Sequence, residues 1–278
     1  MIELSSAACV KAISAMRTFD ACVDNGAFFV KIEDYGHFVC TAIHNGHRMR
    51  PEIEAKCAWS DAQRRHEEDP YIARIIQHMP ITVTGGDSRF EYDLNRAPEQ
   101  CIYEEAWGKP VWKTPLSKEE KNHSLAKHQA FYSVLGALYG KLEDLHPAVL
   151  SHDVHSYNSR RTCAEDDPMF NIGTEQLDTE RWQPDIDEWA QILGEIYLPG
   201  ITVRVAVNEI FFGRGYHATF TTSRFPNILL LPTEIKKTFV KEDGAQPEVK
   251  AILALQAAFG NAIIQHSKAF RKRHWKMH

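Results

Sequence analysis

Three side chains of the kinds that bind metal ions lie far apart in this sequence. His44 and His155 each follow an apolar stretch, and Asp69 ends an acidic run that also contains Glu67 and Glu68. Two imidazoles and one carboxylate would fill three positions of a zinc site and leave the fourth open for water. The set therefore indicates metal-assisted hydrolysis, although the spacing does not decide which of the three acids binds.

Each histidine has to be weighed against the other histidines of the chain. The sequence contains 14, and a single histidine is more often a surface or core residue than a ligand. His47, three residues after His44, is a rival ligand. Small neighbours favour His44 and His155, since Gly46 and Ser156 leave room for a metal close to the backbone.

Two acidic residues are expected to support the site. Asp153 lies two residues before His155, on the same face of an expected strand, where it could orient the ligand or a water molecule. Glu234 follows a strongly apolar run, and a carboxylate there costs free energy unless a partner compensates it. A metal and its water would compensate it, and Glu234 could then move protons. The alternative is a salt bridge to Lys236 or Lys237.

Two arginines, Arg89 and Arg96, flank Asp93 and Asn95 in one short segment. The ordinary interpretation is an exposed strand end with ion pairs. The functional interpretation is substrate recognition, because the planar guanidinium matches a carboxylate and a second arginine can stabilise an oxyanion.

Other kinds of site receive little support. Gly213 and Gly215 lack the lysine and hydroxyl residue of a phosphate loop, and Ser156 lacks the Gly-x-Ser-x-Gly frame of a nucleophile. None of the six cysteines forms a Cys-x-x-Cys pair, which argues against a thiolate zinc site. The six are Cys9, Cys22, Cys40, Cys57, Cys101 and Cys163.

Composition and charge limit the class of protein and the cellular location in which this chemistry would take place. The 278 residues carry a formal net charge of −5 and lack a linker-like stretch, so we expect one domain, residues 1–278, that does not bind nucleic acid. No apolar stretch reaches the roughly 18 residues of a membrane span, and the N-terminus lacks the pattern of a secretory signal. Scattered cysteines are typical of a reducing cytoplasm, which is the expected location.

Apolar periodicity predicts the elements that would position these residues. Predicted strands alternate with predicted helices, which favours an α/β fold, a three-layer sandwich with a central mixed, mostly parallel sheet flanked by helices. Ligands of such sheets lie beyond the carboxyl ends of the strands, where His44, His155, Asn208 and Glu234 are expected. Strands are predicted at residues 27–32, 38–43, 80–84, 147–150, 201–207 and 228–231, and helices at 5–19, 51–56, 61–79 (interrupted near Pro70), 121–145, 184–198 and 247–270, with 98–118 irregular.

Taken together, the ordered motifs resemble the N-formylglutamate amidohydrolase family over most of the chain, from about His44 to Glu234. The stretches that carry the resemblance are Ile43–Gly46, Glu67–Asp69, Ser88–Arg89, Asp93–Arg96, Asp153–Ser156, Asn171–Thr174, Gly213–Tyr216 and Thr233–Ile235. The sequence departs from the family pattern at Ile43 and Asn45, where the family usually has Pro and Ser, at Pro232-Thr233 and at Lys127 before His128, which affects the rim of the pocket more than the catalytic set.

The resemblance implies a fold similar to the zinc carboxypeptidases, with one Zn²⁺ per chain. It implies zinc bound by His44, Asp69 and His155, although iron or manganese also suits such a set. It further implies Glu234 as the general base and Arg89 as the oxyanion partner. Substrate binding would fall to the three residues Asn95, Arg96 and Arg214.

The expected function is therefore zinc-dependent hydrolysis of the amide bond of an N-acyl amino acid with a free carboxylate. N-formyl-L-glutamate is the leading candidate. One alternative is a carboxypeptidase-like hydrolase of a peptide or glutamyl amide. Another is a non-catalytic protein that binds acidic metabolites, although such a protein would be expected to have lost Glu234 or a ligand. The oligomeric state is left open.

Overall fold

The computed structural model describes residues 1–159, 167–240 and 246–275. Within these ranges the chain forms a nine-stranded sheet in the order β1-β2-β3-β5-β4-β8-β11-β9-β10. Five of its strand pairs are parallel and three are antiparallel, which confirms the expected mixed, mostly parallel sheet. The strands are β1 (Ile2–Leu4), β2 (Phe19–Val23), β3 (Phe28–Ile32), β4 (Phe38–Ala42), β5 (Ile81–Gly85), β8 (Val149–Tyr157), β9 (Phe170–Ile172), β10 (Val205–Val207) and β11 (Ile228–Lys236).

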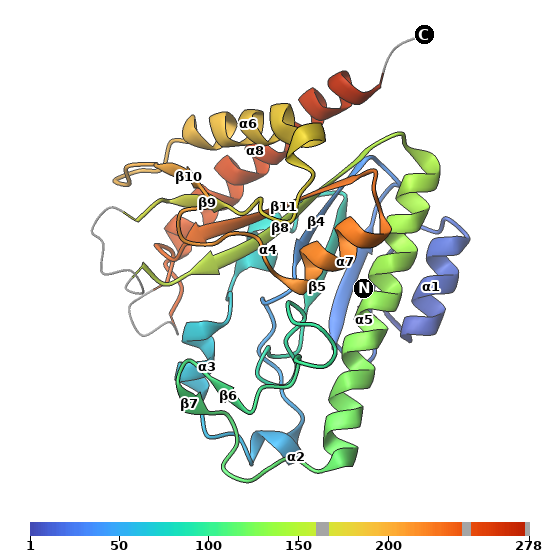
Figure 1. The fold of residues 1–278 in the computed structure, drawn as a ribbon, viewed down its shortest axis with the longest axis vertical. Helices are drawn as coiled ribbons and strands as arrows, with labels where there is room; N and C mark the ends of the chain where they lie inside the picture. The colour runs from blue at the N-terminus through green and yellow to red at the C-terminus, as the bar shows by residue number, and fades with distance from the viewer. Residues whose placement is uncertain (160–166, 241–245, 276–278) are drawn as a thin grey trace.

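Helices cover both faces of this sheet and complete the three-layer α/β sandwich (Figure 1). One buried apolar cluster joins the sheet to α4 (Ile72–Ile76), α6 (Thr179–Gly194) and α8 (Val249–His274). A second cluster joins the opposite face to α1 (Ser6–Ser14), α5 (Lys118–Leu145) and α7 (Tyr216–Arg224). The central strands β4, β5 and β8 and the first half of β11 are thus buried on both faces.

A smaller lobe lies beside the carboxyl ends of the central strands. It contains α2 (Pro51–Glu54), α3 (Asp61–Glu67) and a hairpin of β6 (Glu105–Ala106) and β7 (Lys109–Pro110). A third apolar cluster holds it together, formed by Met49, Ile53, Cys57, Phe90, Ala106, Val111, Trp112 and Leu116. The segment expected to be irregular therefore packs on its own core and contains a hairpin.

Capping residues explain where several helices begin. Ser117 and Glu120 form a capping box, so α5 starts three residues before the predicted boundary. Asp178 caps α6 and accepts a hydrogen bond from the Arg181 amide, so this helix starts before Pro184 rather than at it.

Several predicted boundaries were wrong. The first helix ends at Ser14 and not near Phe19, because Met16 adopts a left-handed φ of 53° and the chain turns into β2. Strand β10 covers only the last three residues of the predicted 201–207. Strands β1, β2 and β9 were not predicted. Strands β8 and β11 run on for several residues, so His155 and Glu234 lie within strands and not after them.

The state of the cysteines and the apolar character of the helices concern the cellular location that the sequence led us to expect. Cys9, Cys22, Cys40, Cys57 and Cys101 are free thiols, whereas Cys163 lies outside the described residues. Among the residues described, we find no helix that combines the length and apolar character needed to cross a membrane.

Candidate metal centre and substrate cavity

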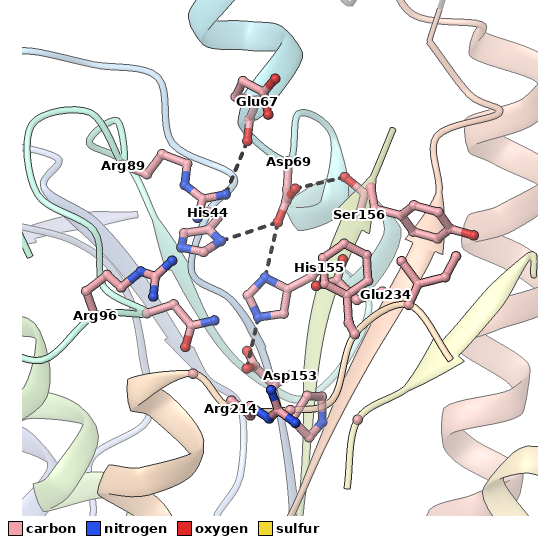
Figure 2. A pocket seen from close by; sticks show the side chains of 18 of the residues that line it. His44, Glu67, Asp69, Arg89, Arg96, Asp153, His155, Ser156, Arg214 and Glu234 are labelled. Carbon is pink, nitrogen blue, oxygen red and sulfur yellow. Dashed lines mark hydrogen bonds and ion pairs between the residues drawn. The ribbon is translucent and has the colours of Figure 1, made fainter. Parts of the chain in front are cut away.

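The neighbouring parallel strands β4, β8 and β11 bring the predicted site residues together at the carboxyl ends of the central strands. His44 follows β4 by two residues, His155 lies in β8, and Glu234 pairs in register with His155 on β11. Figure 2 shows these side chains converging from separate elements. Gly46 permits the tight turn after His44, because a Cβ there would lie 2.2 Å from the carbonyl oxygen of Asp87.

His44, Asp69 and His155 form one buried group. Each exposes only 2–3% of its surface. Asp69 Oδ2 lies 3.2 Å from His155 Nδ1 and 3.6 Å from His44 Nδ1, and one ligand atom from each residue lies within 4.8 Å of the other two. Both imidazoles therefore turn the same nitrogen, Nδ1, toward a shared point beside one carboxylate.

The far nitrogen of each imidazole contacts a second carboxylate. His44 Nε2 lies 2.7 Å from Asp93 Oδ1, and His155 Nε2 lies 3.0 Å from Asp153 Oδ2. A carboxylate in this position holds the ring proton on Nε2 and leaves Nδ1 free to accept a metal. Asp153 thus lies beside His155, as expected from the sequence, and Asp93, which the sequence suggested only as part of the arginine segment, has the matching position beside His44.

The structure separates Asp69 from the neighbouring acids. The Asp69 amide donates to the His44 carbonyl at 3.0 Å, and Ser156 Oγ donates to Asp69 Oδ1 at 3.0 Å. Glu68 instead accepts hydrogen bonds from Ser88 and His47. Burial opposes ionisation of Asp69, but hydrogen bonds and charge from both imidazoles outweigh it and hold the Asp69 pKa below its ordinary value. Asp69 is thus placed to bind as a carboxylate.

His47 does not compete for this position. Its Nδ1 contacts Glu68 at 2.5 Å, and its Nε2 contacts Asp61. Burial disfavours the charged ring, yet these acids outweigh that effect and raise the His47 pKa. Both ring nitrogens of His47 contact acids, so this side chain supports the loop and does not face the group formed by His44, Asp69 and His155.

Glu234 lies at the wall of the cavity beside His155. The salt bridges considered from the sequence are not formed, since Lys237 donates to the carbonyls of His66 and Glu68 and Lys236 approaches the carbonyl of Asp167. Burial raises the pKa of Glu234 to about 8, with Asp69 adding to the rise and His155 opposing it. A carboxyl group with this pKa can exchange protons near neutral pH.

Arg89 is held firmly beside the group formed by His44, Asp69 and His155. Its Nε and Nη2 donate to Asp93 Oδ2 at 3.1 and 2.8 Å, its Nη1 donates to the Glu67 carbonyl at 3.2 Å, and the guanidinium stacks on Trp107. Three of its five donors are used by these bonds. The other two remain available to a substrate in the cavity that Arg89 lines.

Asn95 and Arg96 lie next to each other on the same wall. Asn95 Oδ1 accepts the His217 backbone amide at 3.3 Å, so the amide nitrogen of Asn95 is left for a ligand. Gly215 packs directly against this side chain. Any residue with a Cβ would clash at this position, because the Cβ would lie 2.0 Å from Asn95 Oδ1.

Arg214 also lines the cavity but lies at its rim. Its guanidinium pairs with Glu175 at 2.5 and 2.9 Å, and about two thirds of its side chain is exposed. Part of its hydrogen-bonding capacity is therefore spent outside the cavity.

The cavity has a volume of about 550 Å³ and contains all eight residues predicted to form the site. It also contains residues that sequence reasoning missed. Trp107 and Tyr103 come from the small lobe, and Phe211 and Phe212 come from the loop before α7. The sequence carries no local signal for Trp107, whose place depends on the turn of the hairpin: Trp107 and Gly108 have φ of 50° and 73°, and two left-handed residues form such a tight turn.

A second acidic group, Asp185, Glu188 and His266, also places ligand-type atoms within 4.8 Å of one another. Arg273 pairs with both acids, and His274 Nε2 lies 2.9 Å from Asp185. The Arg273 guanidinium already supplies positive charge to both acids, so this group is a less suitable metal site.

The fold and the site define an α/β enzyme class in which the reacting groups lie at the carboxyl ends of the central parallel strands. A model of the family described as N-formylglutamate amidohydrolase matches residues 36–238. The chain therefore belongs to the N-formylglutamate amidohydrolase family, as its motifs suggested, and this family consists of hydrolases.

Solved structures agree with this fold. An N-formylglutamate amidohydrolase from Ralstonia eutropha JMP134 is 17% identical, with a TM-score of 0.71 over 88% of this chain and 98% of that chain. A gene product from Agrobacterium tumefaciens is 16% identical, with a TM-score of 0.64 over 86% of this chain and 95% of that chain. No curated protein matches the chain by sequence.

Proposed function

We propose that this protein is a zinc-dependent amidohydrolase that cleaves the amide bond of an N-acyl amino acid with a free carboxylate. N-formyl-L-glutamate, giving glutamate and formate, is the first candidate. The observation that carries the proposal is the buried group of His44, Asp69 and His155 in a cavity that also contains Glu234 and two arginines. Membership of the family supports the same reaction class.

The donor set suits a zinc ion. Two Nδ1 atoms and one ionised carboxylate oxygen surround a single point, and each imidazole has its Nε2 beside a carboxylate. When bound there, zinc would supply Lewis acidity, lowering the pKa of water and polarising a carbonyl. His44, Asp69 and His155 would hold it.

Glu234 would act as the proton carrier of the reaction. It would take a proton from the attacking water and return it to the leaving amine, which balances the hydrolysis of an amide. Burial raises its pKa in the metal-free protein, and a cation bound nearby would lower that pKa again, so that the group could both accept and donate a proton near neutral pH. The register of β8 and β11 fixes Glu234 beside His155.

Arg89, Asn95 and Arg96 would recognise the charged parts of the substrate. The two spare donors of Arg89 can stabilise the developing oxyanion. The Asn95 amide nitrogen and the Arg96 guanidinium can bind the substrate carboxylate, which a planar donor fork matches well. Arg214 would contribute from the rim, after its pairing with Glu175 loosens.

The size of the cavity favours a second candidate substrate class. A volume of about 550 Å³ lies within the range of roughly 300–1,000 Å³ that holds drug-sized ligands, which are larger than N-formylglutamate. Trp107, Phe211 and Phe212 add apolar surface to its walls. A larger acyl group or a peptide, as in carboxypeptidase-like hydrolysis, would occupy this space.

The experiment is a substrate panel with zinc-loaded protein. N-formyl-L-glutamate, N-acetyl-L-glutamate, N-benzoyl-L-glutamate and a dipeptide ending in glutamate would be compared by kcat/KM, with release of the free amine as the readout. Each substrate would also be tested as its amide at the α-carboxylate. Turnover that requires the carboxylate supports the proposal, and absence of turnover on the entire panel contradicts it.

We further propose that residues 1–278 act as one catalytic domain on a small molecule in a reducing cytoplasm. The five free thiols support the location. A redox-insensitive melting temperature, measured with and without a thiol reductant, would agree with it, whereas stabilisation by an oxidant would contradict it.

A further inference from the structure

One buried carboxylate, Asp153, is shared by two imidazoles. His155 Nε2 lies 3.0 Å from Asp153 Oδ2, and His217 Nδ1 lies 3.1 Å from the same oxygen. Thr41 Oγ1 donates to the other oxygen, Oδ1, at 2.7 Å. Asp153 exposes 1% of its surface, and His217 and Thr41 are completely buried. Asp153 is therefore a carboxylate with almost no access to water, and its neighbours are the two imidazoles and the Thr41 hydroxyl.

His217 comes from a part of the fold far from the ligands in sequence. It lies in the first turn of α7, directly after the loop that lines the cavity. Its Nε2 lies 2.9 Å from the Tyr139 hydroxyl on α5, which in turn lies 2.7 Å from Ser151 Oγ on β8. The Tyr139 and His217 rings are stacked, with an interplanar angle of 12°. Both ring nitrogens of His217 thus face polar groups while its faces are packed.

We propose that His217 is a positioning residue that, through Asp153, fixes the ring and the tautomer of His155 for metal binding. The inference rests on the proposed metal site. For His155 Nδ1 to accept a metal, the ring proton must sit on Nε2 and be donated to Asp153. A second donor from His217 holds Asp153 in place for that bond.

The other ligand shows why such an anchor is needed. Asp93, which orients His44, is held by the Arg89 guanidinium and by the Tyr103 hydroxyl. A buried carboxylate is costly without compensating donors. No arginine or lysine is paired with Asp153 among the described residues, so His217 and Thr41 are the residues that hold this carboxylate in place of a cationic side chain. His217 Nδ1 approaches Asp153 Oδ2 to 3.1 Å, within ion-pair distance, although the two atoms are not aligned as a hydrogen bond.

Three substitutions separate positioning from simple packing. In His217→Asn the side-chain amide takes the place of Nδ1 and can still donate to Asp153. In His217→Gln the amide takes the place of Nε2 and keeps only the contact with Tyr139. In His217→Leu both polar contacts are lost. Zinc affinity would be measured for each purified protein at fixed pH by competition with a chromophoric chelator, together with the melting temperature of the metal-free form.

We expect His217→Gln and His217→Leu to weaken zinc binding by about 10-fold, the lower end of the effect of removing a ligand's own hydrogen-bond partner, because His217 acts one contact further out, on Asp153. His217→Asn should bind zinc nearly as tightly as the parent. The matched control is His152→Leu, which removes another fully buried imidazole of β8 that neighbours Trp189 and His266. This control should lower stability without changing zinc affinity.

Equal zinc affinity in the Asn and Gln variants would overturn the proposal, whether both are weakened or neither is. If the Leu variant does not fold, the comparison of Asn with Gln still decides the question. A parent protein that binds no zinc would instead refute the proposed function, so the two failures are distinguishable.

Discussion

Glu234 and His155 are register partners on the parallel strands β11 and β8. The expected proton carrier and one expected metal ligand are therefore fixed relative to each other by a backbone ladder and not by a loop. Sites built on such rigid elements hold their geometry more accurately. Burial between neighbouring strands removes water from the Glu234 carboxyl group and raises its pKa, and the positive charge of His155 opposes this rise.

Replacement of Glu234 should separate turnover from metal binding. Glu234→Gln keeps the size of the side chain but cannot carry a proton, so kcat should fall by about 10²- to 10⁴-fold while the zinc content stays at the parent level. The control is Glu105→Gln, an exposed acid on the hairpin that lines the same cavity. A Glu234→Gln protein that turns over at the parent rate would remove this residue from the mechanism.

The neighbouring acids Glu68 and Asp69 should differ in their effect on metal content. The parent should hold about one zinc per chain, as a three-ligand site does, and Asp69→Asn or His155→Ala should abolish it. Glu68→Gln should retain zinc, because Glu68 contacts Ser88 and His47 and not the ligand group. Elemental analysis after dialysis measures this directly. Zinc retained in Asp69→Asn would refute the ligand assignment.

Arg96 and Arg214 should contribute unequally to substrate binding. Arg96→Ala should raise KM by about 10- to 100-fold, corresponding to loss of a charged hydrogen bond of about 1.5–3 kcal/mol, with unchanged zinc content. Arg214→Ala should have a smaller effect because its guanidinium already pairs with Glu175. Steady-state kinetics on the best substrate of the panel compares the two. The reverse order would place the carboxylate at the rim.

A buried imidazole far from the cavity should make the fold sensitive to acid. Burial lowers the pKa of His266 from 6.5 to about 4, while the Asp185 carbonyl and carboxylate favour the charged ring and Arg273 opposes it. Its neighbour His152 shifts in the same direction. Unfolding exposes these rings, and the unfolded chain then binds more protons. Stability should therefore fall as the pH drops from about 6.5 toward 4, with a loss on the order of 3 kcal/mol from His266.

His266→Gln tests this pH dependence, since glutamine can still donate to the Asp185 carbonyl. Urea unfolding of the metal-free protein between pH 4 and 7 should show a shallower loss of stability in the variant than in the parent. Identical pH slopes would show that His266 does not titrate on unfolding.

The sequence predicted the parts of the fold that apolar patterns reveal. Apolar runs in β4 and β5 and at the starts of β8 and β11 predict strands, and His44, His155 and Glu234 come soon enough after these runs to be singled out. The short strands β1 and β9 could not be predicted in this way because each has three residues and depends on its neighbours for pairing.

Tertiary contacts decided the parts of the site that the sequence left open. Asp69 was one of three adjacent acids until its backbone bond to His44 and the left-handed Tyr71 after Pro70 fixed its direction. His217 and Trp107 carry no local signal of their roles. Their positions depend on the packing of α7 against α5 and of the hairpin against the small lobe.

Anomalous diffraction at the zinc edge, from crystals grown with zinc, tests the central claim most directly. The account predicts a single strong peak bounded by Nδ1 of His44, Nδ1 of His155 and the Asp69 carboxylate. A peak at Asp185, Glu188 and His266 instead, or the absence of a peak beside Asp69, would contradict it.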